Sequence, residues 1–151
     1  MKAMISMLGA VAALFVAAGA LAATRGDRTP VDGVYRVTWT EKQAIAAGAP
    51  FRSAHADFGF AHGKPVVIEI TLRGGSFSLR DTSARPACRG TYAVAGVAIS
   101  IDQTTGCFGR VSARWSLHGT VLRLHVTRAT DPGDVVVFGA KPWRKIARES
   151  R

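Results

Sequence analysis

One stretch of the sequence places imidazole and carboxylate side chains close together. His55, Asp57 and His62 fall in a segment with no clear helical or strand period. Zinc accepts two imidazoles and one carboxylate while leaving a fourth position open, so this trio is a candidate metal site. Nothing around these residues fixes a coordination geometry. We therefore predict solvent-facing polar side chains here, with no metal and no cofactor.

The other candidates for catalysis are isolated. His118 lies in a turn signal, and His125 falls on the opposite face of a predicted strand from its apolar neighbours, so both are expected at the surface. Asp131 and Asp134 flank Pro-Gly, and turn preference explains that pair without calcium. The 151 residues contain no Gly-x-x-x-x-Gly-Lys, Gly-x-Gly-x-x-Gly or Gly-x-Ser-x-Gly,. The sequence therefore predicts a protein without enzymatic activity.

Residues 1–23 have the form of an export signal. Lys2 supplies a charged start, an apolar run follows, and the small residues Ala20 and Ala22 suit a signal peptidase,. We predict that the segment is cleaved and that the protein is secreted or periplasmic. Retention of residues 4–23 as a membrane anchor is the alternative.

Export bears on the two cysteines, because thiols oxidise outside the cytoplasm. Cys88 and Cys107 are the only cysteines of the chain, and they flank two short apolar runs. We predict a disulfide between them, which stabilises the fold by about 3 kcal/mol in the loop-entropy model. A redox-active or metal-binding pair is not favoured, since the Cys-x-x-Cys spacing is missing.

The elements that carry these residues follow a period of two. After a linker at 24–30, short alternating runs are separated by turn residues, and Thr40 with Gln43 forms a capping box for a short helix at 41–47,. The predicted strands are 33–39, 65–72, 76–80, 90–94, 97–101, 110–117, 121–127 and 135–138. We predict an all-β domain at 31–146, an antiparallel up-and-down barrel of about eight strands with one short helix after the first strand, followed by a basic tail at 147–151.

Two segments resemble the lipocalin-like, or calycin, β-barrel superfamily. They are Gly33-Val34-Tyr35 at the start of the first strand and Lys141-Pro142-Trp143-Arg144 at the end of the domain. The resemblance implies that Gly33, Tyr35, Trp143 and Arg144 are structural. It implies that the Tyr35 ring fills the closed end of the barrel, where this family usually has Trp, and that Lys141 or Arg144 lies across that ring.

The resemblance also implies a non-catalytic role in binding a small apolar or amphipathic molecule inside the barrel. Four aromatic residues are candidates to contact it. Phe58 and Phe60 lie in the long insertion at 49–64, where they could form a lid over the barrel mouth. Phe77 and Trp115 lie in predicted strands, where they either line a cavity or fill the core.

The charge balance offers a second hypothesis. The chain has 20 Lys and Arg against 10 Asp and Glu, a formal net charge of +10. Most of the basic residues are singly spaced, which favours a solubilising surface. The alternative is an interaction module that docks a basic surface on anionic lipid or glycan of the cell envelope. Nucleic acid is not expected as a partner of an exported protein, and the sequence does not indicate an oligomeric state.

Overall fold

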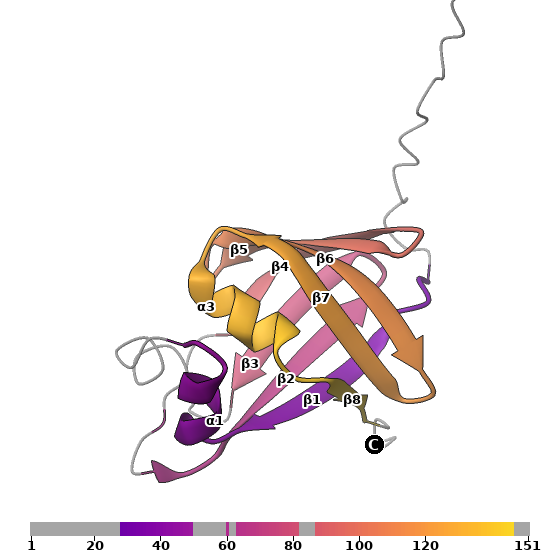
Figure 1. Ribbon diagram of the computed structural model, residues 1–151. Helices are drawn as coiled ribbons and strands as arrows, with labels where there is room; N and C mark the ends of the chain where they lie inside the picture. Colours follow the sequence, from indigo (N-terminus) through magenta and orange to yellow (C-terminus); the bar gives the residue numbers. More distant parts are fainter. Residues whose placement is uncertain (1–27, 50–59, 61–62, 82–86, 147–151) are drawn as a thin grey trace, which may run out of the picture.

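The computed structural model describes residues 28–49, 60, 63–81 and 87–146. Within these residues, eight antiparallel strands form a closed barrel in which each strand pairs with the next and β8 pairs with β1 (Figure 1). The strands are β1 (Gly33–Trp39), β2 (Val66–Arg73), β3 (Ser76–Asp81), β4 (Cys88–Ala95), β5 (Ala98–Thr105), β6 (Gly109–His118), β7 (Val121–Ala129) and β8 (Trp143–Lys145). The predicted all-β, up-and-down barrel is confirmed.

Strand β1 shows why alternation predicted the fold. Tyr35, Val37 and Trp39 are buried, whereas Arg36 and Thr38 between them are exposed. A strand points successive side chains to opposite faces, so one face of β1 enters the core and the other meets solvent.

The helix that follows is capped as its sequence predicts. In α1 (Glu41–Ala46) the Thr40 hydroxyl accepts a hydrogen bond from the Gln43 backbone N–H, and the Thr40 N–H donates to Oε1 of Gln43 at 3.1 Å. The next turn contains Gly48, whose φ of 98° suits glycine,. The predicted short helix after the first strand is therefore confirmed.

The prediction of a strand at 135–138 is wrong. This segment forms a π-helical turn, η2 (Val135–Gly139), that continues from α3 (Pro132–Asp134). The Asp131 carboxylate accepts a hydrogen bond from the Gly133 N–H at 2.6 Å, and Pro132 occupies the first turn, so the expected loop starts a helix instead,. The eighth strand is β8, which overlaps the end of the closing motif and extends one residue beyond it.

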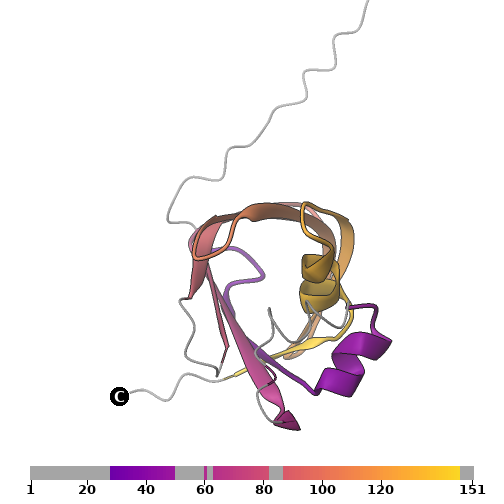
Figure 2. The same ribbon diagram turned by 90° about the vertical axis from the view of Figure 1, so that its left-hand side faces the viewer.

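Strand β8 is short, and the helix that precedes it, η2, packs on β7. Strand β8 pairs with β1 at two positions and with β7 at two positions. Beyond these positions η2 packs on β7, where a Cβ added to Gly139 would lie only 3.1 Å from Cγ2 of Val126. Figure 2 shows this helix lying inside the ring of strands.

Helix η2 carries an aromatic side chain into the centre of the barrel. Phe138 is fully buried, and its ring centroid lies 6.1 Å from that of Phe77 on β3 and 6.3 Å from that of Trp143 on β8. The Trp143 indole N–H donates to the Phe138 carbonyl at 3.1 Å. These rings belong to one hydrophobic core cluster that draws on all eight strands.

The two cysteines form the predicted disulfide. It joins Cys88, at the start of β4, to Cys107 in the connection between β5 and β6, 19 residues further along the chain. The bond therefore fixes the β5–β6 loop against the adjacent strand.

Candidate functional site

The end of the barrel where β1 begins is closed by the residues that precede this strand. Val31 is fully buried, and its carbonyl accepts a hydrogen bond from the Tyr35 hydroxyl at 2.9 Å. The Asp32 carboxylate accepts hydrogen bonds from the Thr29 hydroxyl at 2.6 Å, from the Gly74 N–H at 3.1 Å and from the Tyr92 hydroxyl. These bonds attach the entering chain to the turn between β2 and β3 and to β4.

A lysine covers the Tyr35 ring, but it is neither of the two predicted residues. Lys145 places Nζ 5.6 Å from the ring centroid and donates to the Asp32 carbonyl at 2.8 Å. Gly33 permits this approach, since a Cβ there would lie 2.6 Å from Cε of Lys145. Lys141 instead lies over the ring of Trp39, at 4.7 Å. Arg144 points outward from β8, because it alternates with the buried Trp143.

The pKa values of Tyr35 and Asp32, at this end of the barrel, are those expected of structural residues. Burial raises the pKa of Tyr35 to about 12, and the nearby Asp32 charge acts in the same direction. Burial also acts to raise the pKa of Asp32, but hydrogen bonds from Thr29, Tyr92 and Gly74 outweigh it, and the net pKa is lowered,. The phenol stays protonated and the carboxylate charged at neutral pH, so neither group is poised to exchange protons there.

Three of the four residues predicted to contact a ligand are described, and all three belong to the core cluster or pack against it. Phe77 packs on Phe138 in the core. Phe60 is buried and belongs to the same cluster. Trp115 is half-buried and donates its indole N–H to the Gly96 carbonyl at 3.0 Å. Phe58 lies outside the described residues, so the lid that it would form with Phe60 stays a prediction.

No catalytic or metal site is found in the part of the chain that the structure describes. That part contains no cluster of three His, Cys, Asp or Glu side chains able to hold a metal ion. His55, Asp57 and His62 lie outside it. His118 and His125 are exposed, His118 at the end of β6 and His125 on the outer face of β7.

The chemically distinctive surface is the outer face of β6, β7 and β8. These three adjacent strands contain no Asp or Glu. Five exposed arginines lie on them, and we call this set the cationic face: Arg110, Arg114, Arg123, Arg128 and Arg144. Among the described residues, one of the five, Arg110, forms an ion pair, with Asp102 of β5. Four uncompensated charges therefore remain on one side of the barrel.

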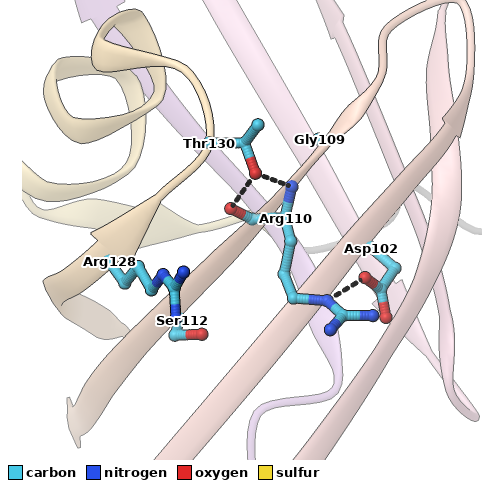
Figure 3. A pocket seen from close by; sticks show the side chains of 6 residues that line it. All are labelled: Asp102, Gly109, Arg110, Ser112, Arg128 and Thr130. Carbon is cyan, nitrogen blue, oxygen red and sulfur yellow. Dashed lines mark hydrogen bonds and ion pairs between the residues drawn. The ribbon is translucent and has the colours of Figure 1, made fainter.

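A pocket of about 480 Å³ lies at one edge of this face (Figure 3). We call it the Arg128 pocket, and its lining residues are Asp102, Gly109, Arg110, Ser112, Arg128 and Thr130. The Thr130 side chain accepts a hydrogen bond from the Arg110 N–H at 3.1 Å, while its own N–H donates to the Arg110 carbonyl at 3.0 Å. These bonds hold the far end of β7 against the start of β6.

A β-bulge places Arg128 in this pocket. Val126 pairs with Ala113, but the next pair of the ladder is Arg128 with Ser112, which leaves Thr127 as an extra residue. Leu122, Leu124 and Val126 face the core, so unbroken alternation would turn Arg128 inward as well. The bulge shifts the pattern by one residue, with the result that Arg128 faces solvent,.

One feature of the sequence indicates this face, although the charge balance of the whole chain does not. No acidic residue occurs between Asp102 and Asp131, although four arginines do. Counting charges by strand, rather than over the whole chain, would have located the imbalance. No comparable pattern in the sequence predicts the bulge between Ser112 and Ala113.

Comparison with known proteins identifies no relative of this chain. No family model, curated protein or solved structure matches it. The lipocalin-like resemblance therefore remains a prediction beside the observed barrel. Among the described residues, no helix is both long enough and apolar enough to cross a membrane.

Proposed function

We propose that this protein is an exported, non-catalytic module that docks its cationic face on an anionic surface of the cell envelope. The observation that carries the proposal is the absence of acidic residues from three adjacent strands that hold five exposed arginines. Clustered positive charge attracts polyanions and raises the rate at which they associate. The arginines extend from β strands rather than from loops, so a well-ordered sheet sets their spacing.

The test compares two triple variants that each remove three positive charges. The first variant removes three of the five positive charges of the cationic face and combines Arg114→Gln, Arg123→Gln and Arg144→Gln. The matched control changes Arg28, Lys64 and Arg73 to Gln, exposed residues that lie outside the face. The probe is dextran sulfate, a soluble polyanion, in about 0.1 M salt, where charges more than about 10 Å apart are largely screened.

We expect wild type to bind with an affinity that falls steeply as salt is added. The face variant should bind about a hundredfold more weakly, at roughly fivefold for each arginine. The control should lose less than about threefold, since its charges are screened from the bound polymer. Equal losses in the two variants would refute a localised docking face.

A second candidate function, binding of a small apolar or amphipathic ligand inside the barrel, is favoured by one observation. Phe60, which belongs to the long insertion, is buried in the barrel core. A lid would carry an aromatic side chain in this way. Uptake of a hydrophobic fluorescent probe that is indifferent to salt would support this candidate over the first.

A further inference from the structure

The Arg128 pocket has hydrogen-bond donors without a protein acceptor. Among the described residues, Arg128 forms no ion pair and the Ser112 hydroxyl forms no hydrogen bond. The two residues are register partners on β7 and β6, and Figure 3 shows the guanidinium beside the serine side chain. A guanidinium and a hydroxyl on one side of a pocket can donate together to the oxygens of one anion.

Arg110 is the third donor of the pocket, and the carboxylate of Asp102 holds it in place. Nε of Arg110 donates to Oδ1 of Asp102, and no other ion pair of this guanidinium is found among the described residues. Two arginines and one aspartate give the pocket a single surplus positive charge. This charge matches an anion with one negative charge, such as a phosphodiester, better than a dianion.

An exposed aromatic residue adjoins the pocket. Phe108 precedes Gly109 of the lining, and 79% of it is exposed, the largest fraction among the exposed large hydrophobic residues described. The disulfide at Cys107 holds the loop on one side of Phe108, and the bonds between Arg110 and Thr130 hold it on the other. The ring is therefore presented to solvent by a supported loop, although its apolar area favours burial.

Val135 is another exposed apolar residue, with 46% of it exposed. Its neighbour Asp134 lies against the loop, since a Cβ on Gly109 would be 3.7 Å from Oδ2 of Asp134. The acidic side chains here are engaged within the fold. Asp134 accepts a hydrogen bond from Nε2 of Gln103 at 3.0 Å, and Asp131 accepts from the Gly133 N–H.

We propose that the Arg128 pocket binds the phosphodiester of an anionic phospholipid headgroup while Phe108 enters the bilayer interface beside it. This inference rests on the proposed docking function and names its partner. A supported aromatic residue next to an anion pocket fits a bilayer, which offers charge and hydrocarbon side by side. A soluble acidic glycan offers the charge alone.

The experiment measures co-sedimentation with vesicles of phosphatidylcholine that contain a minor fraction of phosphatidylglycerol, and in parallel binding to dextran sulfate. Wild type is compared with Arg128→Gln, Ser112→Ala and Phe108→Ser. Arg144→Gln is the matched control, because it removes one charge from the same face at a distance from the pocket. Every chain includes the same residues 1–23 or has lost them by processing, so this segment contributes equally to all.

We expect Arg128→Gln to weaken vesicle binding by about thirtyfold and Ser112→Ala by about threefold, since charge-assisted hydrogen bonds are lost. Arg144→Gln should cost about fivefold. Phe108→Ser should weaken vesicle binding about tenfold and leave dextran sulfate binding unchanged. Thermal unfolding of each variant checks that it is folded.

The outcomes separate the two proposals. Binding to dextran sulfate without binding to the vesicles would overturn the phospholipid inference and leave the docking function standing. If Arg128→Gln and Arg144→Gln weaken vesicle binding equally, the pocket is not the binding site. If Phe108→Ser binds vesicles as well as wild type, the aromatic contact with the bilayer is refuted. If wild type binds neither probe, the docking function and the inference that depends on it both fail.

Discussion

Two sides of the barrel use arginine in opposite ways. On the outer face of β1–β3, Arg36 and Arg80 are the register partners of Glu69 on either side. Nη2 of Arg36 lies 3.0 Å from one carboxylate oxygen, and Nη2 of Arg80 lies 2.6 Å from the other. On the cationic face, by contrast, four of the five arginines have no acidic partner among the described residues.

The difference shows in the burial of the acidic partner. Glu69 is only 9% exposed, because two guanidinium groups cover it. Burying a carboxylate is costly unless it is paired and hydrogen-bonded, so the three residues depend on one another for stability. The arginines of the cationic face cover no such group. The same residue type is thus structural on one side and available to a partner on the other, and four changes test this contrast.

The largest effect is expected where the cationic face depends on backbone geometry. Inserting one residue between Ser112 and Ala113 would give Thr127 a partner and remove the bulge, so Arg128 would take the inward position two residues after Val126,. An unpaired guanidinium would then enter the core, and we expect a loss of more than about 4 kcal/mol in the free energy of unfolding. Urea denaturation measures this loss. Adding Arg128→Ala to the insertion should recover part of it; no recovery would mean that the bulge does not direct this side chain.

This bulge also marks where sequence patterns stop being informative. Alternation located seven of the strands, since one buried face repeats every second residue. The alternation of Leu122, Leu124 and Val126 does not predict the change of register that follows, because that change depends on how β7 pairs with β6. The strand predicted at 135–138 was wrong for a related reason. Three valines and a phenylalanine suit a strand locally, but the capped turn before them and the burial of Phe138 select a helix,.

The candidate site was predictable in part. The disulfide followed from the predicted export and the count of two cysteines, and Tyr35 at the closed end followed from the resemblance. The residue that covers Tyr35 could not be predicted, since a difference of one register position decides whether a side chain of β8 faces the ring. Lys145 pairs with Tyr35 in the ladder, whereas Arg144 pairs with Arg36 on the outside.

The second change removes the covalent support beside the cationic face. Replacing Cys88 and Cys107 by Ser should lower the free energy of unfolding by about 3 kcal/mol, because the unfolded chain regains the entropy of the open loop. Denaturation with and without reductant measures the loss in wild type, and the double variant should be insensitive to reductant. The loop that holds Phe108 should also exchange its amide hydrogens faster, whereas β1–β3 should not.

The third change breaks the arginine pairing on the opposite side. Glu69→Gln should cost about 2 kcal/mol, because three charge-assisted hydrogen bonds are weakened or lost and Arg36 and Arg80 are left without their carboxylate,. Binding to dextran sulfate should be at least as strong as in wild type, since this variant leaves the cationic face intact and removes a negative charge. A variant that keeps full stability would show that the ion pairs are only surface contacts.

Acid should have the same effect as this substitution. Burial acts to raise the pKa of Glu69, but the hydrogen bonds and charges of Arg36 and Arg80 outweigh it, so the net pKa is lowered. A carboxylate with a lowered pKa in the folded state stabilises the protein above its unfolded-state value, about 4.3, and this contribution is lost as the pH falls through the folded pKa. Unfolding measured from pH 7 down to about pH 3 should therefore show a shallower acid slope in Glu69→Gln than in wild type.

The smallest effect is expected for Arg114→Gln, which completes the contrast with Glu69→Gln. Arg114 is exposed, its cross-strand neighbours are Ala98 and His125, and no carboxylate contacts it among the described residues. Removing its charge should change the free energy of unfolding by less than about 0.5 kcal/mol, and in low salt the change should be stabilising because like charges nearby are relieved. Denaturation at two salt concentrations measures this sign. A loss of 1 kcal/mol or more would mean that the cationic face supports the fold, and its arginines would then be structural like those around Glu69.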